Sequence, residues 1–134
     1  HTRTILVGDI NQNPFEEGLV SAKGLHAVMS ADVARRNTRI FNGKAYRFFY
    51  NPMWGMFSDC KGSPPGTFFY NVANKCQFFW HMLDQVLIRP SLIPRFESDS
   101  LEIITSDSRG TLLDRKGRPS KRIASDHLPI VFKI

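Results

Sequence analysis

The stretch that decides the fold is WHMLDQVLI, which runs from Trp80 to Ile88. Its apolar and β-branched residues predict a long buried strand over residues 78–88. Asp84 stands inside this run, and a buried carboxylate without a partner is unfavourable, so we expect it to be paired or hydrogen-bonded. On this stretch alone, a structural ion pair and a chemical role for Asp84 are equally supported. His81 is interpreted as a histidine at the surface or at the edge of the core, and not as a catalytic one.

Further strand-like and helix-like segments lie on both sides of this run. Strands are predicted for residues 4–7, 45–50, 67–70, 101–105 and 128–134. A short helix is expected after Asn13-Pro14, with Glu16 and Glu17 in its first turn, and a second over residues 30–36 with Ser30 or Asp32 as N-cap. Residues 53–66 and 106–121, rich in glycine, proline or polar residues, are interpreted as loops.

Length and composition indicate one folded α/β domain. The chain has 134 residues, of which 42% are hydrophobic and 22% charged, so a single core is feasible and disorder is disfavoured. No apolar run approaches the roughly 20 residues that span a bilayer. The net charge of +6 fits a solvated basic surface as well as attraction to polyanions such as nucleic acid. The basic loop over residues 106–121 is interpreted as a solvated connection, because it has no aromatic residue for base stacking.

The cysteine content and the first residues set expectations about location and completeness. Cys60 and Cys76 are the only cysteines, too few for a disulfide framework or a zinc site, so we expect reduced thiols and a cytoplasmic protein. No secretory signal is visible, because His1 and Arg3 lead directly into a strand-like segment. A chain that opens inside a core strand is expected to be a fragment.

Two further polar motifs interrupt apolar segments. Asp9 and Asn11 follow the first strand, and alternate residues of an extended chain point to the same side. A carboxylate beside a carboxamide could orient a water and hold a phosphate oxygen, although Asp-x-Asn alone is more typical of a turn. Asp126 and His127 precede the last strand. Asp126 offers a hard oxygen ligand for Mg²⁺ or Mn²⁺, and His127 offers a donor or a proton-transfer group; in isolation this pair also fits a turn.

Taken together, the three motifs resemble the C-terminal half of the endonuclease/exonuclease/phosphatase superfamily, which includes deoxyribonuclease I. That half carries, in order, Gly-Asp-x-Asn after a strand, Asp-x-(Ile/Val) in an apolar strand, and Ser-Asp-His-x-Pro-(Ile/Val) near the end. The chain matches with Gly8–Asn11, Asp84–Val86 and Ser125–Ile130. The resemblance covers Thr4 to Ile134.

The resemblance implies a fold and a set of roles. The fold would be the C-terminal half of a four-layer α/β/β/α sandwich, with a mixed, largely antiparallel sheet and short helices. Asp9 would orient or deprotonate the attacking water, and Asn11 would bind a nonbridging phosphate oxygen. Asp126 would bind Mg²⁺ or Mn²⁺, and His127 would stabilise the transition state. Asp84 would accept a hydrogen bond from a catalytic histidine, either His127 or one in the other half.

The resemblance also implies limits on the isolated chain. The metal-binding Glu of the N-terminal half is missing, and Glu16 and Glu17 follow the first motif and do not replace it. We therefore expect weak metal binding and little activity. Half of a sandwich would expose an apolar sheet face, which predicts a homodimer. The candidates for that face are Phe48, Tyr50, Phe69, Phe79 and Val86.

The function expected from the resemblance is metal-dependent hydrolysis of a phosphoester, by a nuclease, phosphodiesterase or phosphatase. The substrate stays open between DNA, RNA, phospholipid and other phosphoesters. The alternative is a non-catalytic module on the same scaffold that binds nucleic acid or protein. Trp54 could stack on a base of a substrate, but anchoring a packed loop is its favoured role.

Overall fold

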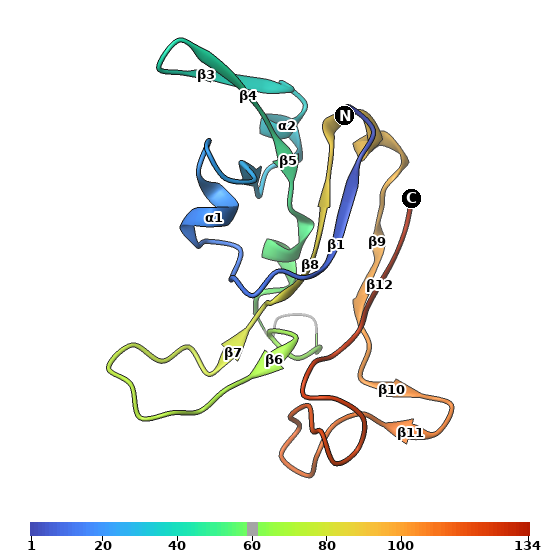
Figure 1. The fold of residues 1–134 in the computed structure, drawn as a ribbon. Coiled ribbons are helices and arrows are strands. Elements are labelled where there is room, and N and C mark those ends of the chain that lie inside the picture. The colour runs from blue at the N-terminus through green and yellow to red at the C-terminus, as the bar shows by residue number, and fades with distance from the viewer. Residues whose placement is uncertain (59–61) are drawn as a thin grey trace.

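The computed structural model describes residues 1–58 and 62–134 and has a mixed α/β fold in which antiparallel strands predominate (Figure 1). The central sheet has the strand order β1-β8-β5-β2, in which β2 runs parallel to β5 and the other neighbours are antiparallel. Its strands are β1 (Ile5–Asp9), β2 (Ala27–Val28), β5 (Phe49–Tyr50) and β8 (Asp84–Ile88).

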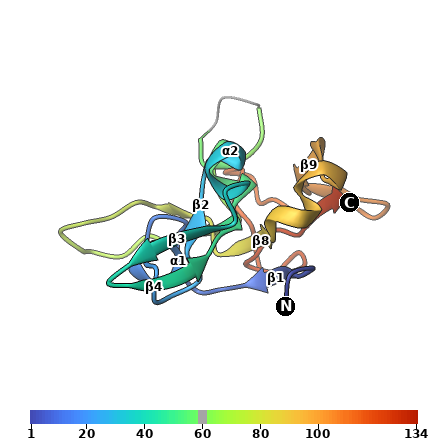
Figure 2. The same cartoon turned by 90° about the horizontal axis from the view of Figure 1, so that it is seen from above.

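The other strands form two-stranded antiparallel sheets around this centre. They are β3 (Thr38–Phe41) with β4 (Lys44–Arg47), β6 (Phe68–Phe69) with β7 (Trp80–His81), β9 (Glu97–Ile103) with β12 (Ile130–Lys133), and β10 (Ser106–Asp107) with β11 (Gly110–Thr111). Seen from above, β1 lies at one edge of the central sheet next to β8, and the β3–β4 hairpin lies on the far side (Figure 2).

The helices are short, as the sequence predicted. They are α1 (Glu17–Val20), α2 (Ala31–Ala34) and the 3-10 helices η1 (Pro52–Met56) and η2 (Pro90–Arg95). The N-cap of α2 is Ser30, whose Oγ accepts a hydrogen bond from the backbone N–H of Val33 at 3.3 Å. None of the helices among the described residues has the length and apolar character needed to cross a membrane.

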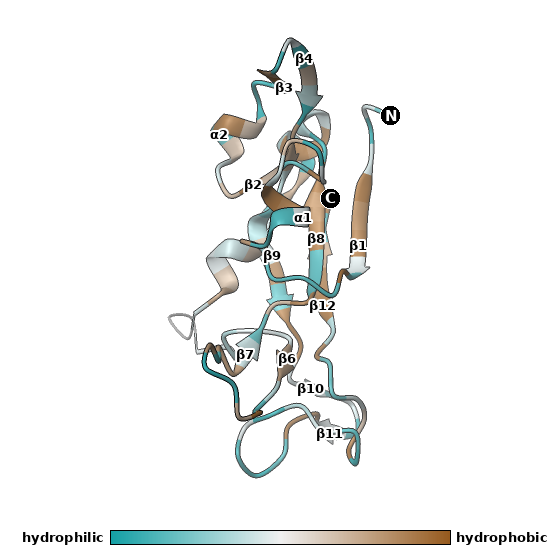
Figure 3. Cartoon of the chain, turned by 60° about the vertical axis from the view of Figure 1, so that its left-hand side comes forward, coloured by the Kyte–Doolittle hydropathy of each residue, from teal (hydrophilic) through white to brown (hydrophobic). Residues whose placement is uncertain are grey.

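Strand β8 is the centre of the core because both of its faces are covered. Val86 and Ile88 are fully buried in a cluster that includes Met53, Met82 and Leu128. Leu87 points to the other face and packs with Leu19, Ala27 and Phe49. Hydrophobic colouring of β1 and β8 gives way to hydrophilic residues toward one end of each strand (Figure 3). At that end the register places Asp9 opposite Asp84.

The prediction of one continuous strand over residues 78–88 is wrong. The strand is broken between β7 and β8, so one apolar run serves two different sheets. At the break, side chains replace strand partners: the N–H of Met82 donates to Asn13 Oδ1, and the N–H of Leu83 donates to Thr67 Oγ1. Apolar periodicity does not reveal such a break, because the run stays buried or partly buried immediately on both sides of it.

The predicted strand over residues 45–50 also divides, and its first part forms a hairpin that the sequence analysis did not predict. Thr38–Phe41 pairs with Lys44–Arg47 through Asn42-Gly43. Both turn residues have positive φ, 49° and 73°, as a type I′ turn requires. The Asn-Gly dipeptide between two β-rich segments was the signal for this hairpin.

The exposed apolar face predicted for a dimer is wrong for two of its five residues. Phe48 is 4% exposed and Val86 is 0% exposed, because both lie in the chain's own core. Tyr50 and Phe69 are half-buried, whereas Phe79 is exposed. Apolar residues on one face of a strand predict that this face is covered. They do not show whether a partner or the same chain covers it.

The basic segment over residues 106–121 is ordered by its own hydrogen bonds. The β10–β11 hairpin opens it, and Leu113 and Pro119 form a β-bridge. Asp114 Oδ1 accepts hydrogen bonds from the N–H groups of Lys116 and Arg118, at 2.8 and 3.0 Å. These bonds define a tight turn within the connection that the sequence predicted as a loop.

Candidate functional site

The centre of the candidate site is a hydrogen-bonded pair formed by Asp84 and His127. Asp84 Oδ2 lies 2.8 Å from His127 Nδ1, although the residues are 43 positions apart. The Asp84 side chain is 18% exposed and that of His127 is 27% exposed, so the pair lies at the surface with partial shielding. When Nδ1 carries the proton and donates a hydrogen bond to the carboxylate, Nε2 is free to contact a substrate. Of the two histidine sources left open for Asp84 by the sequence, the structure shows His127.

The ring of His127 is held on a second side by an aromatic residue. The centroids of the Phe68 and His127 rings are 4.8 Å apart, with an interplanar angle of 37°. The backbones of the same two residues form an antiparallel β-bridge. The segment that carries His127 is therefore fixed beside β6 before the last strand begins, and the imidazole has a defined direction.

Asp9 lies next to this pair through the sheet register. It is the direct antiparallel partner of Asp84 at the ends of β1 and β8. Side chains of directly opposite residues lie on the same face of a sheet, with Cβ atoms about 4.5–5.5 Å apart. Two neighbouring carboxylates repel each other, and the contact of Asp84 with the imidazole offsets part of that repulsion. Asp9 itself is exposed.

Asn11 is directed at Asp9 by a turn, and not by the extended chain that the sequence analysis assumed. β1 ends at Asp9, and Asn11 has a φ of 55°, in the left-handed region that asparagine tolerates. Its N–H donates to Asp9 Oδ1 at 2.9 Å and its Nδ2 donates to Asp9 Oδ2 at 3.3 Å. The turn interpretation and the grouping of the two side chains are therefore both correct.

Asp126 lies beside His127 in the chain and forms an ion pair with a lysine. Its Oδ2 is 3.1 Å from Lys121 Nζ, and its side chain is 37% exposed. Partial desolvation acts to raise the pKa of Asp126, but the hydrogen bond and charge of Lys121 outweigh it and hold the pKa below its usual value. The carboxylate is thus ionised at neutral pH and partnered by a cation from its own chain.

The described residues do not form a complete metal site. No group of three or more histidine, cysteine, aspartate or glutamate side chains in residues 1–58 and 62–134 is placed to hold one ion. Mg²⁺ takes near-octahedral oxygen coordination. Asp84 and Asp126 each already have a partner in the chain. The Mg²⁺ or Mn²⁺ expected from the sequence therefore does not fit these residues alone.

Trp54 lies away from this group, in the packing of the short helices. It is half-buried in η1, with its ring 6.4 Å from that of Phe15, and it lines a small apolar hollow formed mainly by residues 27–30 and Val33. Asp9, Asn11, Asp84, Asp126 and His127 do not border that hollow. The packed-anchor role is therefore the one that the structure supports.

His81 is a half-buried histidine, as the sequence analysis proposed, and it belongs to a supporting network. Its Nδ1 is 3.0 Å from Asn13 Nδ2, and Asn13 also donates to Glu16 Oε1. Burial lowers the pKa of His81, while the charge of Glu16 acts to raise it. Asn13 is 2% exposed, and this network fixes the turn that follows Asn11 against the backbone of Met82.

Three buried polar residues near the site were not singled out by the sequence analysis. Gln85 and Asn51, both 0% exposed, are joined by a 2.8 Å hydrogen bond from Asn51 Nδ2 to Gln85 Oε1. Gln85 Nε2 also donates to the backbone carbonyls of Gln12 and Met82. Thr67, also 0% exposed, contacts the start of β8. Polar residues inside apolar segments were the available signal, but only Asp84 was interpreted through it.

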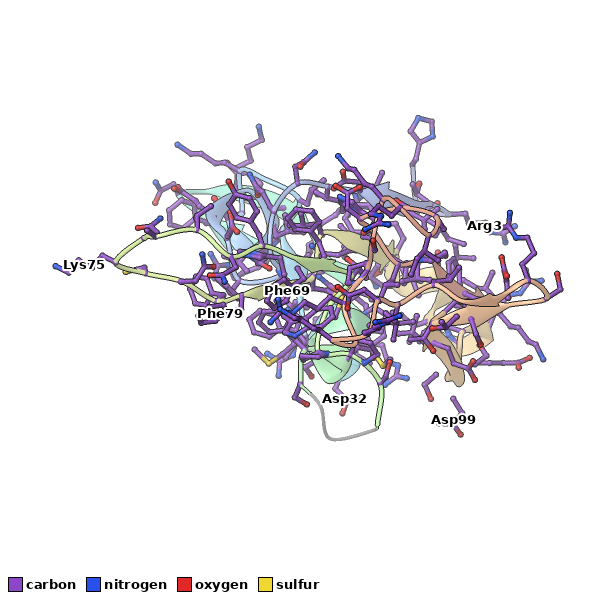
Figure 4. All side chains as sticks on the ribbon, turned by 90° about the horizontal axis from the view of Figure 1, so that it is seen from below. Arg3, Asp32, Phe69, Lys75, Phe79 and Asp99 are labelled. Atoms are coloured by element: carbon purple, nitrogen blue, oxygen red, sulfur yellow. The ribbon has the colours of Figure 1, made fainter. Side chains whose placement is uncertain are left out.

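The β6–β7 hairpin extends beside the site and presents exposed aromatic residues. Figure 4 shows Phe69 and Phe79 close together on this hairpin, and Lys75 at its outer end. The guanidinium of Arg118 lies 4.0 Å from the centre of the Phe69 ring. The aromatic residues that the basic loop lacks in sequence are thus supplied by another segment. Cys76 of this hairpin is exposed, and Cys60 lies outside the described residues.

None of the protein-family models, curated proteins or solved structures compared with the chain matches it. The evidence for a function therefore comes from the geometry of the residues and from the motifs described above.

Proposed function

We propose that this chain supplies the acid–base and phosphate-binding residues of a phosphoester hydrolase. The single observation that carries the proposal is the hydrogen-bonded Asp84–His127 pair beside Asp9, which is its partner in the sheet register. Positions 9, 84 and 127 are far apart in the sequence, so local structure does not account for the proximity of these side chains. Their proximity is what the superfamily resemblance requires.

The chemistry follows from the partners of each side chain. Asp84 accepts a hydrogen bond from the Nδ1–H group of His127, which fixes the tautomer and leaves Nε2 for a phosphoryl oxygen or a leaving group. Asp9 is exposed and can accept a proton from a water that is aligned with the phosphorus atom. Asn11 Nδ2, which points to Asp9, can instead donate to a nonbridging oxygen. Asp126 completes a polar rim around His127.

The described residues supply only some of the positive charge that would neutralise the phosphoryl group during hydrolysis. We propose that Asp126 contributes one oxygen ligand to Mg²⁺ or Mn²⁺ and that the other protein ligands lie outside the described residues. The full sandwich domain, of which this chain would be the C-terminal half, would provide them. A reducing, cytoplasmic setting belongs to the same proposal.

The test is hydrolysis by the full-length gene product with Mg²⁺ or Mn²⁺. The substrates are nucleic acid, phosphoinositide and a simple aryl phosphodiester. His127→Ala should reduce kcat by about 100-fold or more, because positioned acid–base groups contribute roughly 10²–10⁴-fold. The matched control is His1→Ala, at an exposed histidine outside the site. Absence of turnover on every substrate, or equal rates for both variants, would refute the proposal.

The alternative of a non-catalytic binding module is favoured by one observation. Residues 114–123 surround a surface hollow of about 700 Å³ whose lining includes four cations, Arg115, Lys116, Arg118 and Arg122, against one carboxylate, that of Asp114. Like charges held together favour a polyanionic partner such as nucleic acid. Under this alternative, an oligonucleotide binds with strong salt dependence and is never cleaved.

Because Phe48 and Val86 are buried in the chain's own core, the homodimer that we propose would use other apolar residues that are exposed. Leu6, Val7 and Val131 are 38%, 53% and 45% exposed on β1 and β12. Sedimentation of the chain over a range of concentrations tests the proposal. Val7→Lys should shift the distribution toward the monomer, and a wild-type chain that remains monomeric at the highest concentration would refute it.

A further inference from the structure

Thr67 is the residue through which the strand carrying Asp84 and the segment carrying His127 are joined. Its Oγ1 accepts hydrogen bonds from the N–H groups of Leu83 at 3.2 Å and of Asp84 at 3.1 Å. Its carbonyl accepts a hydrogen bond from the N–H of Leu128 at 2.8 Å. A single fully buried residue therefore holds the backbone of Asp84 itself and the backbone next to His127.

The neighbours of Thr67 leave it little freedom. On one side, a Cβ added to Gly66 would lie 2.5 Å from the carbonyl oxygen of His81, so the two backbones approach as closely as only glycine allows. The N–H of Thr67 donates to that same carbonyl at 2.9 Å. On the other side, Phe68 pairs with His127 by a β-bridge and by ring contact. The segment Gly66–Phe68 is thus fixed at both ends.

The position of Asp84 explains why a side-chain acceptor is needed. β5 pairs with β8 at Ile88, the opposite end of the strand, and β1 pairs along the other edge. The Thr67 hydroxyl therefore takes the N–H groups at the beginning of β8. Without it, two partly buried donors would lose their acceptor, which is unfavourable in a folded protein. Relaxation of these groups toward other acceptors would rotate the peptide that carries the Asp84 side chain.

We propose that Thr67 is a positioning residue for the Asp84–His127 pair. Its hydroxyl fixes the direction of the Asp84 carboxylate, and its carbonyl fixes the backbone adjacent to His127. The 2.8 Å contact between the two side chains depends on both. The catalytic consequence rests on the proposed function, whereas the effect on the pair does not.

The experiment compares Thr67→Val with Thr67→Ser in the chain by ¹⁵N–¹H NMR of the histidine ring. Valine keeps the shape of threonine but removes the acceptor, and serine keeps the acceptor. In wild type and in Thr67→Ser, we expect the His127 ring to be protonated on Nδ1, with a downfield, slowly exchanging Hδ1 signal. In Thr67→Val, we expect that signal to broaden or to disappear. Thr38→Val, at an exposed threonine, is the control and should leave it unchanged.

A second measurement covers the case in which Thr67→Val does not fold. In the wild-type chain, the amide protons of Leu83 and Asp84 should exchange about as slowly as that of Leu128. Exchange of both amides at the rate of exposed loop residues would overturn the proposal. An unchanged His127 Hδ1 signal in a folded Thr67→Val variant would overturn it as well.

Failure of this proposal is distinguishable from failure of the proposed function. If Thr67→Val disturbs the ring signal but the full-length protein hydrolyses no phosphoester, the positioning role stands and the hydrolase proposal fails. If the full-length protein is active, Thr67→Val should lower kcat by at least about 10-fold with little change in KM, since geometry and not substrate contact is lost. Thr67→Ser should retain most of the wild-type kcat.

Discussion

Replacing Gln85 by methionine should destabilise the fold strongly, although the substitution preserves side-chain length and increases apolar character. Gln85 is 0% exposed and bonds to Asn51 Nδ2 and to the backbone carbonyls of Gln12 and Met82. Methionine leaves two buried partners and one partly buried partner, the Gln12 carbonyl, without their hydrogen bond. Each unsatisfied buried group costs about 1–3 kcal/mol, and the groups share one network, so the sum is not fully additive.

A net loss of about 3 kcal/mol is therefore expected, after the gain of about 1–2 kcal/mol from burying a more apolar side chain. That is a large part of the roughly 5–15 kcal/mol that stabilises a typical domain. With an m-value of about 1.5 kcal/mol/M, the midpoint of urea unfolding should fall by about 2 M. Trp54 and Trp80 provide the fluorescence signal.

A midpoint within about 0.5 M of wild type would refute the reasoning, because the same m-value then limits the loss to less than about 1 kcal/mol. The double variant with Asn51→Leu provides the internal control. Its effect should be smaller than the sum of the two single effects by about 1 kcal/mol, since the residues share one hydrogen bond.

Three further outcomes are expected. Gly66→Ala should cost about 1–3 kcal/mol in urea unfolding, because the new Cβ would meet the His81 carbonyl; equal stability would contradict this. Lys121→Met should raise the pKa of Asp126, measured by carboxyl ¹³C NMR, and an unchanged value would show that the ion pair is not formed in solution. Burial and the charge of Arg39 lower the pKa of His26, so the unfolded state binds the proton more tightly. Stability should therefore fall as the pH drops below about 6.5, and His26→Gln should weaken that dependence in thermal unfolding at several pH values.

Much of the candidate site could be predicted from the sequence, because its residues interrupt apolar strands. Asp84 was expected to have a partner on physical grounds, and it has one in His127. The sequence could not show which histidine would be that partner, because the contact joins residues 43 positions apart. Nor could it show Lys121 beside Asp126, because a lysine in a polar loop is ordinarily solvated.

The central strands were predicted more accurately than the irregular parts. β1 and β8 follow from β-branched apolar residues, whose burial the structure shows for Val86 to Ile88. The expected burial of the strand over residues 4–7 is wrong, because Leu6 and Val7 are exposed at the edge of the sheet. The break before Asp84 depends on acceptors from Asn13 and Thr67, which are distant in sequence. Local pattern carries no information about such partners. The Asn42-Gly43 hairpin, in contrast, had a local signal.

The separation in sequence between Asp84 and its partner has a consequence for synthesis of the protein. The carboxylate belongs to the central sheet, whose four strands all lie within residues 1–88. Until His127 has left the ribosome, that nascent sheet carries adjacent Asp9 and Asp84 carboxylates with no imidazole beside them. A translation product that stops before this histidine should therefore fold with a less stable sheet end, and quality control by proteases would act on it first.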